Sequence, residues 1–137
     1  MNCIFCKIVN GEIPSHKVYE DEATLAFLDI NPVSDGHTLV IPKKHSENIY
    51  DIREDSLQKV ALTVQKVAKA VKTAFNADGV NILQANGATA GQAVFHYHVH
   101  IVPRKQGDKL PSLHGWASAK PLGNDGQGIA DKIRQNI

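Results

Sequence analysis

The sequence has no long apolar run and almost no net charge. No apolar stretch approaches the roughly 20 residues that a membrane-spanning helix needs, and Met1-Asn2-Cys3 lacks the basic start of a signal peptide. With 15 basic and 14 acidic side chains, the formal net charge is +1, so no broad positive field attracts nucleic acid or an anionic membrane. We therefore expect a cytoplasmic protein without a nucleic-acid or membrane partner.

Cysteine is also scarce, since Cys3 and Cys6 are the only two in the chain. In the reducing cytoplasm they would be thiols or metal ligands and not a disulfide. Taken alone, the Cys-x-x-Cys spacing has three interpretations: a redox couple, half of a zinc site, or two small buried side chains.

The chain is long enough for one domain with a substantial core. It has 137 residues, 42% of them hydrophobic, and neither an internal repeat nor a recognisable linker. We expect a single domain over residues 1–137, with its core at about 3–104 and a C-terminal loop and short helix at 105–137.

The spacing of apolar residues indicates an α+β fold. Helical spacing predicts a short helix at 3–10, a long helix at 51–75 with Asp55 or Ser56 near its N-cap, and a short C-terminal helix. Strand-like segments between turn residues cover 17–20, 23–30, 37–41, 80–86 and 95–102. We expect an antiparallel sheet of about five strands, one long helix and short terminal helices.

The most specific pattern is His96-Tyr97-His98-Val99-His100-Ile101-Val102. Side chains of an extended strand alternate between faces, so the histidines would line one surface while the residues between them, with Phe95, pack behind it. The preceding loop at 87–92 consists of small residues and Gln, and such a loop can bring backbone N–H groups close to an oxyanion.

This stretch resembles the His-φ-His-φ-His-φ-φ signature (φ apolar) of the histidine triad nucleotide hydrolases and transferases, and the similarity extends from Cys3 to about Arg104. The resemblance is to the Hint-like, bacterial zinc-containing type. It implies the fold of that family and a homodimer in which two sheets join edge to edge.

The resemblance also implies a nucleophile and its surroundings. It places the nucleophile on His98, and has His100 contribute polar contacts around the phosphate. A neutral imidazole suits this role, because it is a good nucleophile that a phosphate anion does not repel. Charge on the phosphate oxygens would be met by side-chain and backbone donors of Asn86, Gln92, Ala93 and Val94.

The rest of the nucleotide pocket is implied in the same way. Asp29 matches the carboxylate that holds the ribose hydroxyls, although its position also suits a turn former at a strand end. His37 matches a group near the phosphate, and an ordinary strand histidine is the alternative. The apolar slot for the base would be formed by Ile4, Phe5, Ile8, Phe27 and Ile30.

Some bacterial family members with both cysteines carry structural zinc at positions that match Cys3, Cys6, His45 and His96. Two thiolates and two imidazoles suit tetrahedral zinc. In that case His96 serves the structure, and the chemistry itself requires no metal.

The implied function is hydrolysis of a purine nucleotide at its α-phosphate, on a nucleoside phosphoramidate or acyl-nucleotide, through a nucleotidyl-histidine. One alternative is a dinucleoside polyphosphate hydrolase or nucleotidyl transferase that uses the same residues. Another is a regulatory module that binds nucleotide with little turnover.

Overall fold

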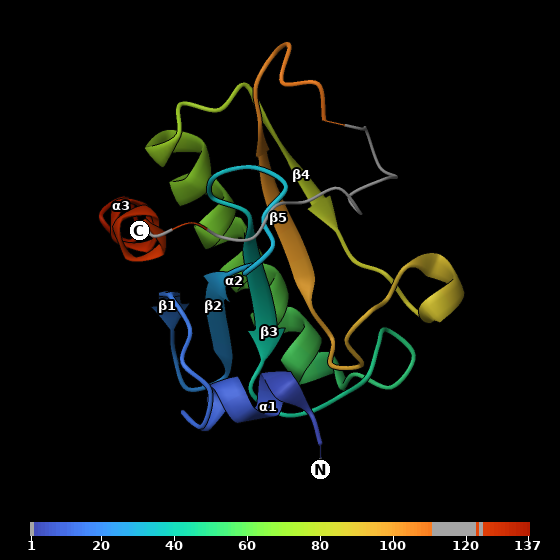
Figure 1. The fold of residues 1–137 in the computed structure, drawn as a ribbon. Helices are drawn as coiled ribbons and strands as arrows, with labels where there is room; N and C mark the ends of the chain where they lie inside the picture. The colour runs from blue at the N-terminus through green and yellow to red at the C-terminus, as the bar shows by residue number, and fades with distance from the viewer. Residues whose placement is uncertain (1, 111–122, 124) are drawn as a thin grey trace.

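The computed structural model describes residues 2–110, 123 and 125–137. As predicted, it contains one antiparallel sheet of five strands, in the order β1-β2-β3-β5-β4 (Figure 1). The strands are Lys17–Glu20 (β1), Thr24–Leu28 (β2), Thr38–Pro42 (β3), Gly79–Leu83 (β4) and Val99–Arg104 (β5). The helices are Ile4–Val9 (α1), the long Glu54–Ala74 (α2) and Gly126–Arg134 (α3), with a short 3-10 turn at Ala88–Ala90 (η1).

Helices cover both faces of the central strands. On β2, Leu25 and Phe27 pack in one apolar cluster with residues of α1, whereas Ala26 and Leu28 pack in a second cluster with α2. All residues of β2 and β3 are therefore buried, which explains why these strands read as nearly continuous apolar runs. The α2 face is the larger core, and α3 completes it beside β1 (Figure 1).

This arrangement decides where the histidines lie. Val99 and Ile101 belong to the α2-side core, as the period-two pattern predicted. Because neighbouring side chains of a strand point to opposite faces, His100 lies on the α1 side. The ring of His98 is on this side as well, edge-on to the Phe5 ring of α1 with 5.2 Å between ring centroids.

The structure corrects three local predictions. Helix α2 begins at Glu54 and not at residue 51, with Arg53 as its N-cap, so Asp55 and Ser56 lie near the cap as expected, in the first turn. Phe95 does not pack behind the histidines, because its side chain is 43% exposed. The β5 ladder begins only at Val99, after the first two histidines.

Two further expectations concern the C-terminal third and the membrane. The short C-terminal helix is present as α3, but most of the loop expected at its start falls on residues 111–122, outside the described residues. None of the helices in the described part of the chain is long and apolar enough to cross a membrane.

The loop between β2 and β3, residues 29–37, rests on the end of α2. Gly36 has a φ of +96°, and a Cβ added there would lie 2.6 Å from the Phe75 ring. Only glycine allows both this backbone conformation and this approach. Because His37 follows directly and Thr38 begins β3, the contact also helps to position His37 at the end of this loop.

We expect Gly36→Ala to lower the free energy of unfolding by about 2–4 kcal/mol, since it combines backbone strain with a clash against Phe75. Gly11→Ala is the matched control: φ there is +79°, and the new Cβ would meet no described atom within 4 Å. Urea denaturation of both variants measures the difference. Equal losses in the two variants would contradict the role assigned to the Phe75 contact.

Candidate functional site

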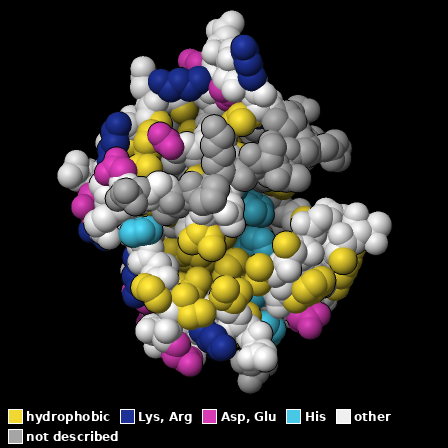
Figure 2. All heavy atoms as spheres, in the orientation of Figure 1, with side chains coloured by type: hydrophobic (Ala, Val, Ile, Leu, Met, Phe, Trp, Pro, Cys, Tyr) yellow, Lys and Arg dark blue, Asp and Glu magenta, His cyan; other side chains and the backbone are white. Residues whose placement is uncertain are grey.

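Three imidazoles gather on the α1 side of the sheet. The ring centroids of His98 and His100 are 5.0 Å apart, and those of His37 and His100 are 5.1 Å apart. His37 comes from the end of the loop before β3, so segments far apart in sequence meet here. Histidine side chains are visible in a hollow of this face, next to a group of apolar side chains (Figure 2).

Hydrogen bonding defines the tautomer of His98. Its Nδ1 lies 2.7 Å from the carbonyl oxygen of His96, and because a carbonyl only accepts, Nδ1 carries the proton and donates. Burial lowers the pKa of His98, which keeps the ring neutral near pH 7. The lone pair of the neutral ring is therefore on Nε2, where it can act as a nucleophile.

The apolar side of the site has a buried part and an exposed part. Phe5, Ile8 and Phe27 are buried in the α1-side cluster, and the rings of Phe5 and Phe27 meet edge to face at 5.4 Å. Ile4 and Ile30 are 44% and 66% exposed. All five were expected to form a base slot, and the structure places Phe5 directly beside the His98 ring.

Asp29 lies at the start of the same loop that carries His37. Its Oδ1 accepts the Asn31 N–H at 2.8 Å, which is the turn-forming contact that the sequence offered as an alternative. Its Oδ2 lies 3.5 Å from His37 Nε2. The carboxylate is thus held beside the imidazole cluster and partly exposed, so that one group both shapes the turn and faces the site.

The small-residue loop is closed by the buried side chain of Gln92. Its Oε1 accepts the Gly87 N–H at 2.8 Å, while its Nε2 donates to the carbonyl oxygens of Glu47 and Val94 at 2.6 and 3.1 Å. These bonds occupy the amide inside the protein, so Gln92 supports the loop that holds Ala93 and Val94. Sequence reasoning did not identify the Glu47 carbonyl, because a backbone acceptor leaves no signal in residue type.

Asn86 is also tied to its surroundings. Its Oδ1 accepts the Ile49 N–H at 2.8 Å, and its Nδ2 donates to Gln84 Oε1 at 2.8 Å. An amide nitrogen has a second N–H, so Asn86 can still donate one hydrogen bond to a phosphate oxygen.

Cys3, Cys6, His45 and His96 form a second, adjacent cluster whose ligand atoms all lie within 4.8 Å of one another. The sulfur of Cys3 is 3.4 Å from His96 Nδ1, and that of Cys6 is 3.4 Å from His45 Nδ1. The two Nδ1 atoms are 3.2 Å apart. Tetrahedral zinc with ordinary bond lengths would have S···N edges of about 3.6 Å and N···N edges of about 3.3 Å. The spacing therefore fits a zinc ion.

The protonation of this cluster also suits a metal. His96 Nε2 donates to the Pro42 carbonyl oxygen at 2.8 Å, which leaves the Nδ1 lone pair directed at the cysteines. Burial lowers the pKa of His96 to about 4, so the ring is neutral. Burial and the neighbouring Cys3 raise the pKa of Cys6 to about 11, so a cation is needed to stabilise the Cys6 sulfur as a thiolate near pH 7.

Comparisons with known proteins agree with this geometry. The HIT domain matches residues 10–107. "Protein hit" of Bacillus subtilis is 56% identical over 103 residues, which are 75% of this chain and 71% of the relative. The Arabidopsis thaliana protein named adenylylsulfatase HINT3 is 43% identical over 117 residues, which are 85% of this chain and 57% of that protein.

One solved structure, described as a Zn-bound histidine triad family protein from Mycobacterium smegmatis, superposes with a TM-score of 0.88 and 39% identity, covering 99% of this chain and 93% of that chain. The two chains therefore share one fold. Together with the match over residues 10–107, these similarities confirm the resemblance drawn from the histidine stretch: the chain belongs to the HIT domain family.

Proposed function

We propose that this chain hydrolyses purine nucleotides at the α-phosphate through a covalent intermediate on Nε2 of His98. The observation that carries the proposal is the hydrogen bond from His98 Nδ1 to the His96 carbonyl oxygen at 2.7 Å. It directs the lone pair of a neutral ring away from the backbone and holds the ring in one orientation, as an activated nucleophile requires.

The reaction has two displacements. Nε2 of His98 attacks the α-phosphorus, a P–N bond forms, and the bond from phosphorus to the leaving group breaks. Water then attacks the same phosphorus, the P–N bond breaks, and the freed nitrogen or solvent takes the proton of the water. We assign the stabilisation of charge on the phosphate oxygens to the backbone N–H groups of Ala93 and Val94 and to the Asn86 amide, while the Gln92 bonds hold their loop.

The rest of the site supports a nucleoside monophosphoryl group as the part recognised. Asp29 offers a partly exposed carboxylate for the ribose hydroxyls, and the apolar residues around Phe5 offer a surface for a flat base. A mixed anhydride or phosphoramidate of a purine nucleotide fits this pattern. The name of one relative, adenylylsulfatase HINT3, indicates a substrate of the same class.

Replacing His98 with Ala should reduce turnover of adenosine phosphoramidate or an acyl-adenylate by at least ~10³-fold, because it removes the attacking nitrogen. Binding of AMP should change only several-fold, as measured by calorimetry. His16→Ala is the matched control, since His16 contacts Gln127 of α3 and should leave the rate unchanged. Retained turnover in the His98 variant would refute the nucleophile.

Intact-mass spectra of acid-quenched wild-type reactions should show one added nucleotidyl group, absent from the His98 variant. If AMP binds but neither turnover nor this adduct is found on any of these substrates, the chain is a nucleotide-binding module and not a hydrolase.

We infer that Cys3, Cys6, His45 and His96 hold a structural zinc ion, because their spacing and protonation fit one. The metal would join α1 to the loop after β3 and to the segment before β5. It stays outside the reaction, because the nucleophile is His98 and no step requires a Lewis acid.

Elemental analysis should find about one zinc per chain, falling close to zero in Cys6→Ser. The variant should unfold at a lower temperature, because metal-binding free energy no longer adds to folding. His16→Ala, which alters a histidine outside the cluster, should keep the metal. Wild-type metal content near zero after growth with added zinc would overturn the assignment.

We also propose that the protein forms a homodimer through β4. This strand is the outer strand of the described sheet at the side opposite β1, and it exposes 49% of Ile82. An exposed edge with apolar side chains favours pairing with a second copy, whereas the β1 side is packed against α3.

Sedimentation should therefore give the mass of two chains, and Ile82→Asp should shift it to one, because the change places a charge on the expected interface. Ile137→Asp is the control. Ile137 is similarly exposed, at 46%, but it follows α3, which packs beside β1 at the opposite edge of the sheet. A monomeric wild-type protein at micromolar concentration would exclude the dimer.

A further inference from the structure

His37 is held by a backbone donor that fixes where its proton lies. The N–H of Val33 points at His37 Nδ1 at 3.2 Å, so Nδ1 must accept and cannot carry a proton. His37 is almost fully buried, and burial lowers its pKa, so the ring is neutral. The single proton of the neutral ring is therefore on Nε2.

That proton is directed at His100. His37 Nε2 lies 2.9 Å from His100 Nδ1, with Asp29 Oδ2 on the same nitrogen at the longer distance of 3.5 Å. Because His37 Nε2 donates, His100 Nδ1 must accept. Burial lowers the pKa of His100 to about 3, so this ring is neutral too, and its proton is on Nε2.

The neighbouring histidines of the triad thus have opposite tautomers. His98 is protonated on Nδ1 and has a lone pair on Nε2, whereas His100 has its lone pair on Nδ1 and an N–H at Nε2. The two rings lie 5.0 Å apart on the same side of the sheet, so one can offer an electron pair and the other a donor to the same phosphoryl group.

We propose that His37 is a positioning residue: held by the Val33 N–H, it fixes His100 in the tautomer that donates a hydrogen bond from Nε2 to the phosphate or leaving group. The catalytic part of this proposal rests on the proposed function. The tautomer of His100 does not, because it follows from bonds within the protein.

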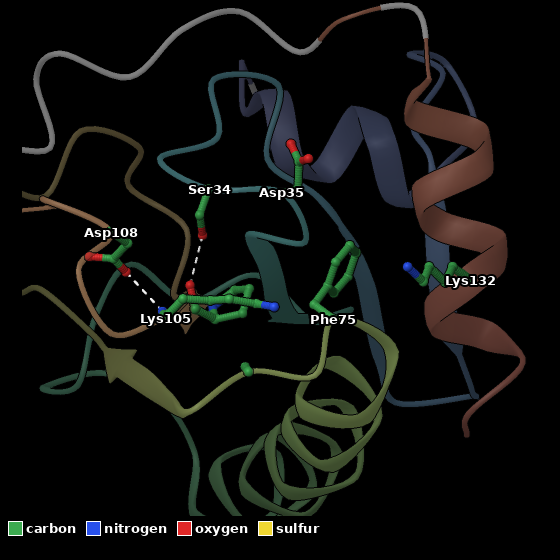
Figure 3. A pocket seen from close by; sticks show the side chains of 8 residues that line it. Ser34, Asp35, Phe75, Lys105, Asp108 and Lys132 are labelled. Carbon is green, nitrogen blue, oxygen red and sulfur yellow. Dashed lines mark hydrogen bonds between the residues drawn. The ribbon is translucent and has the colours of Figure 1, made fainter.

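The loop that presents Val33 is itself firmly held. The Ser34 hydroxyl donates to the Pro103 carbonyl oxygen at 2.9 Å (Figure 3), and His37 N–H donates to the Ser34 carbonyl oxygen at 3.1 Å. Phe75 stands beside Gly36 and lines the same cavity of about 350 Å³ as Ser34 (Figure 3). The end of α2 therefore supports the loop that orients His37.

The same bonds argue against a second metal site. Asp29, His37 and His100 have ligand atoms within 4.8 Å of one another, which is close enough for a cation. A metal on His37 Nε2 would force the proton to Nδ1, where it would face the Val33 N–H. Two donors would then oppose each other in a buried place, which costs about 1–3 kcal/mol.

Two substitutions separate the two contacts of His37. In His37→Gln the terminal amide reaches the position of Nε2 and can still donate to His100. In His37→Asn the shorter amide can satisfy the Val33 N–H but does not reach His100. Both substitutions remove the imidazole ring, and Asn also leaves a smaller side chain, so the readout that separates them is the tautomer of His100 and not stability.

The direct measurement is ¹⁵N NMR of the histidine rings in the ligand-free protein at neutral pH. In the wild type, His100 should be protonated on Nε2 and His98 on Nδ1. His37→Asn should convert His100 to a mixture of tautomers, and His37→Gln should preserve the wild-type form. Wild-type His100 protonated on Nδ1, or an unchanged tautomer in His37→Asn, would overturn the proposal. The wild-type spectrum needs no variant, so it remains decisive even if a variant fails to fold.

Kinetics tests the role in catalysis. The kcat of His37→Asn should fall about 10–100-fold with KM within ~3-fold of the wild type, while His37→Gln should recover most of the rate. Equal rates for the two variants would overturn the positioning role. If the NMR spectra show the expected tautomers of His98 and His100 but no nucleotidyl-enzyme forms, the proposed function is wrong and the tautomer assignment stands.

Discussion

A buried neutral imidazole needs an acceptor for its one N–H and a donor or other partner for the lone pair of its second nitrogen. This requirement organises the centre of the molecule. His96 donates to the Pro42 carbonyl and turns its lone pair to the cysteines. His98 donates to the His96 carbonyl, and its lone pair remains on the nitrogen assigned to attack. In His100 the lone pair accepts the His37 N–H, and the proton lies on Nε2, the donor that we propose for the phosphate or leaving group. The hydrogen-bond partner of each ring thereby determines which of its two nitrogens carries the proton.

The rings can be neutral because the sheet is covered on both faces. Helix α1 buries the side that carries the histidines, and α2 buries the other. A protonated imidazole there would lose its hydration, so the pKa values fall and the rings stay uncharged near pH 7. The chain also has a net charge of only +1. An anionic substrate must therefore be stabilised by directed N–H groups at short range, which is effective where water is excluded.

The sequence predicted the features that depend on periodicity, and missed those that depend on backbone groups. Period two correctly put Val99 and Ile101 in the core, and the apolar stripe located α2. Tyr97, two residues before the ladder begins, still packs in the same core, and the pattern failed only at Phe95, four residues before the ladder. The Val33 N–H and the Pro42 carbonyl could not be found from residue types, since every residue but proline has the first group and every residue has the second.

The late start of β5 also explains why the two clusters lie so close together. Pairing with β3 begins at Val99, so no ladder bond positions the His96 carbonyl that orients the His98 ring. That carbonyl is instead placed by the bond from Tyr97 N–H to the Ser46 carbonyl oxygen at 2.7 Å, and by the His96 ring between Pro42 and the cysteines. A metal bound through the His96 ring would fasten the same short segment to α1. Metal ligation by the His96 ring would thus hold this segment in place, as strand pairing does farther along β5. That is a structural reason for the cysteine and histidine cluster to lie beside the proposed catalytic histidines.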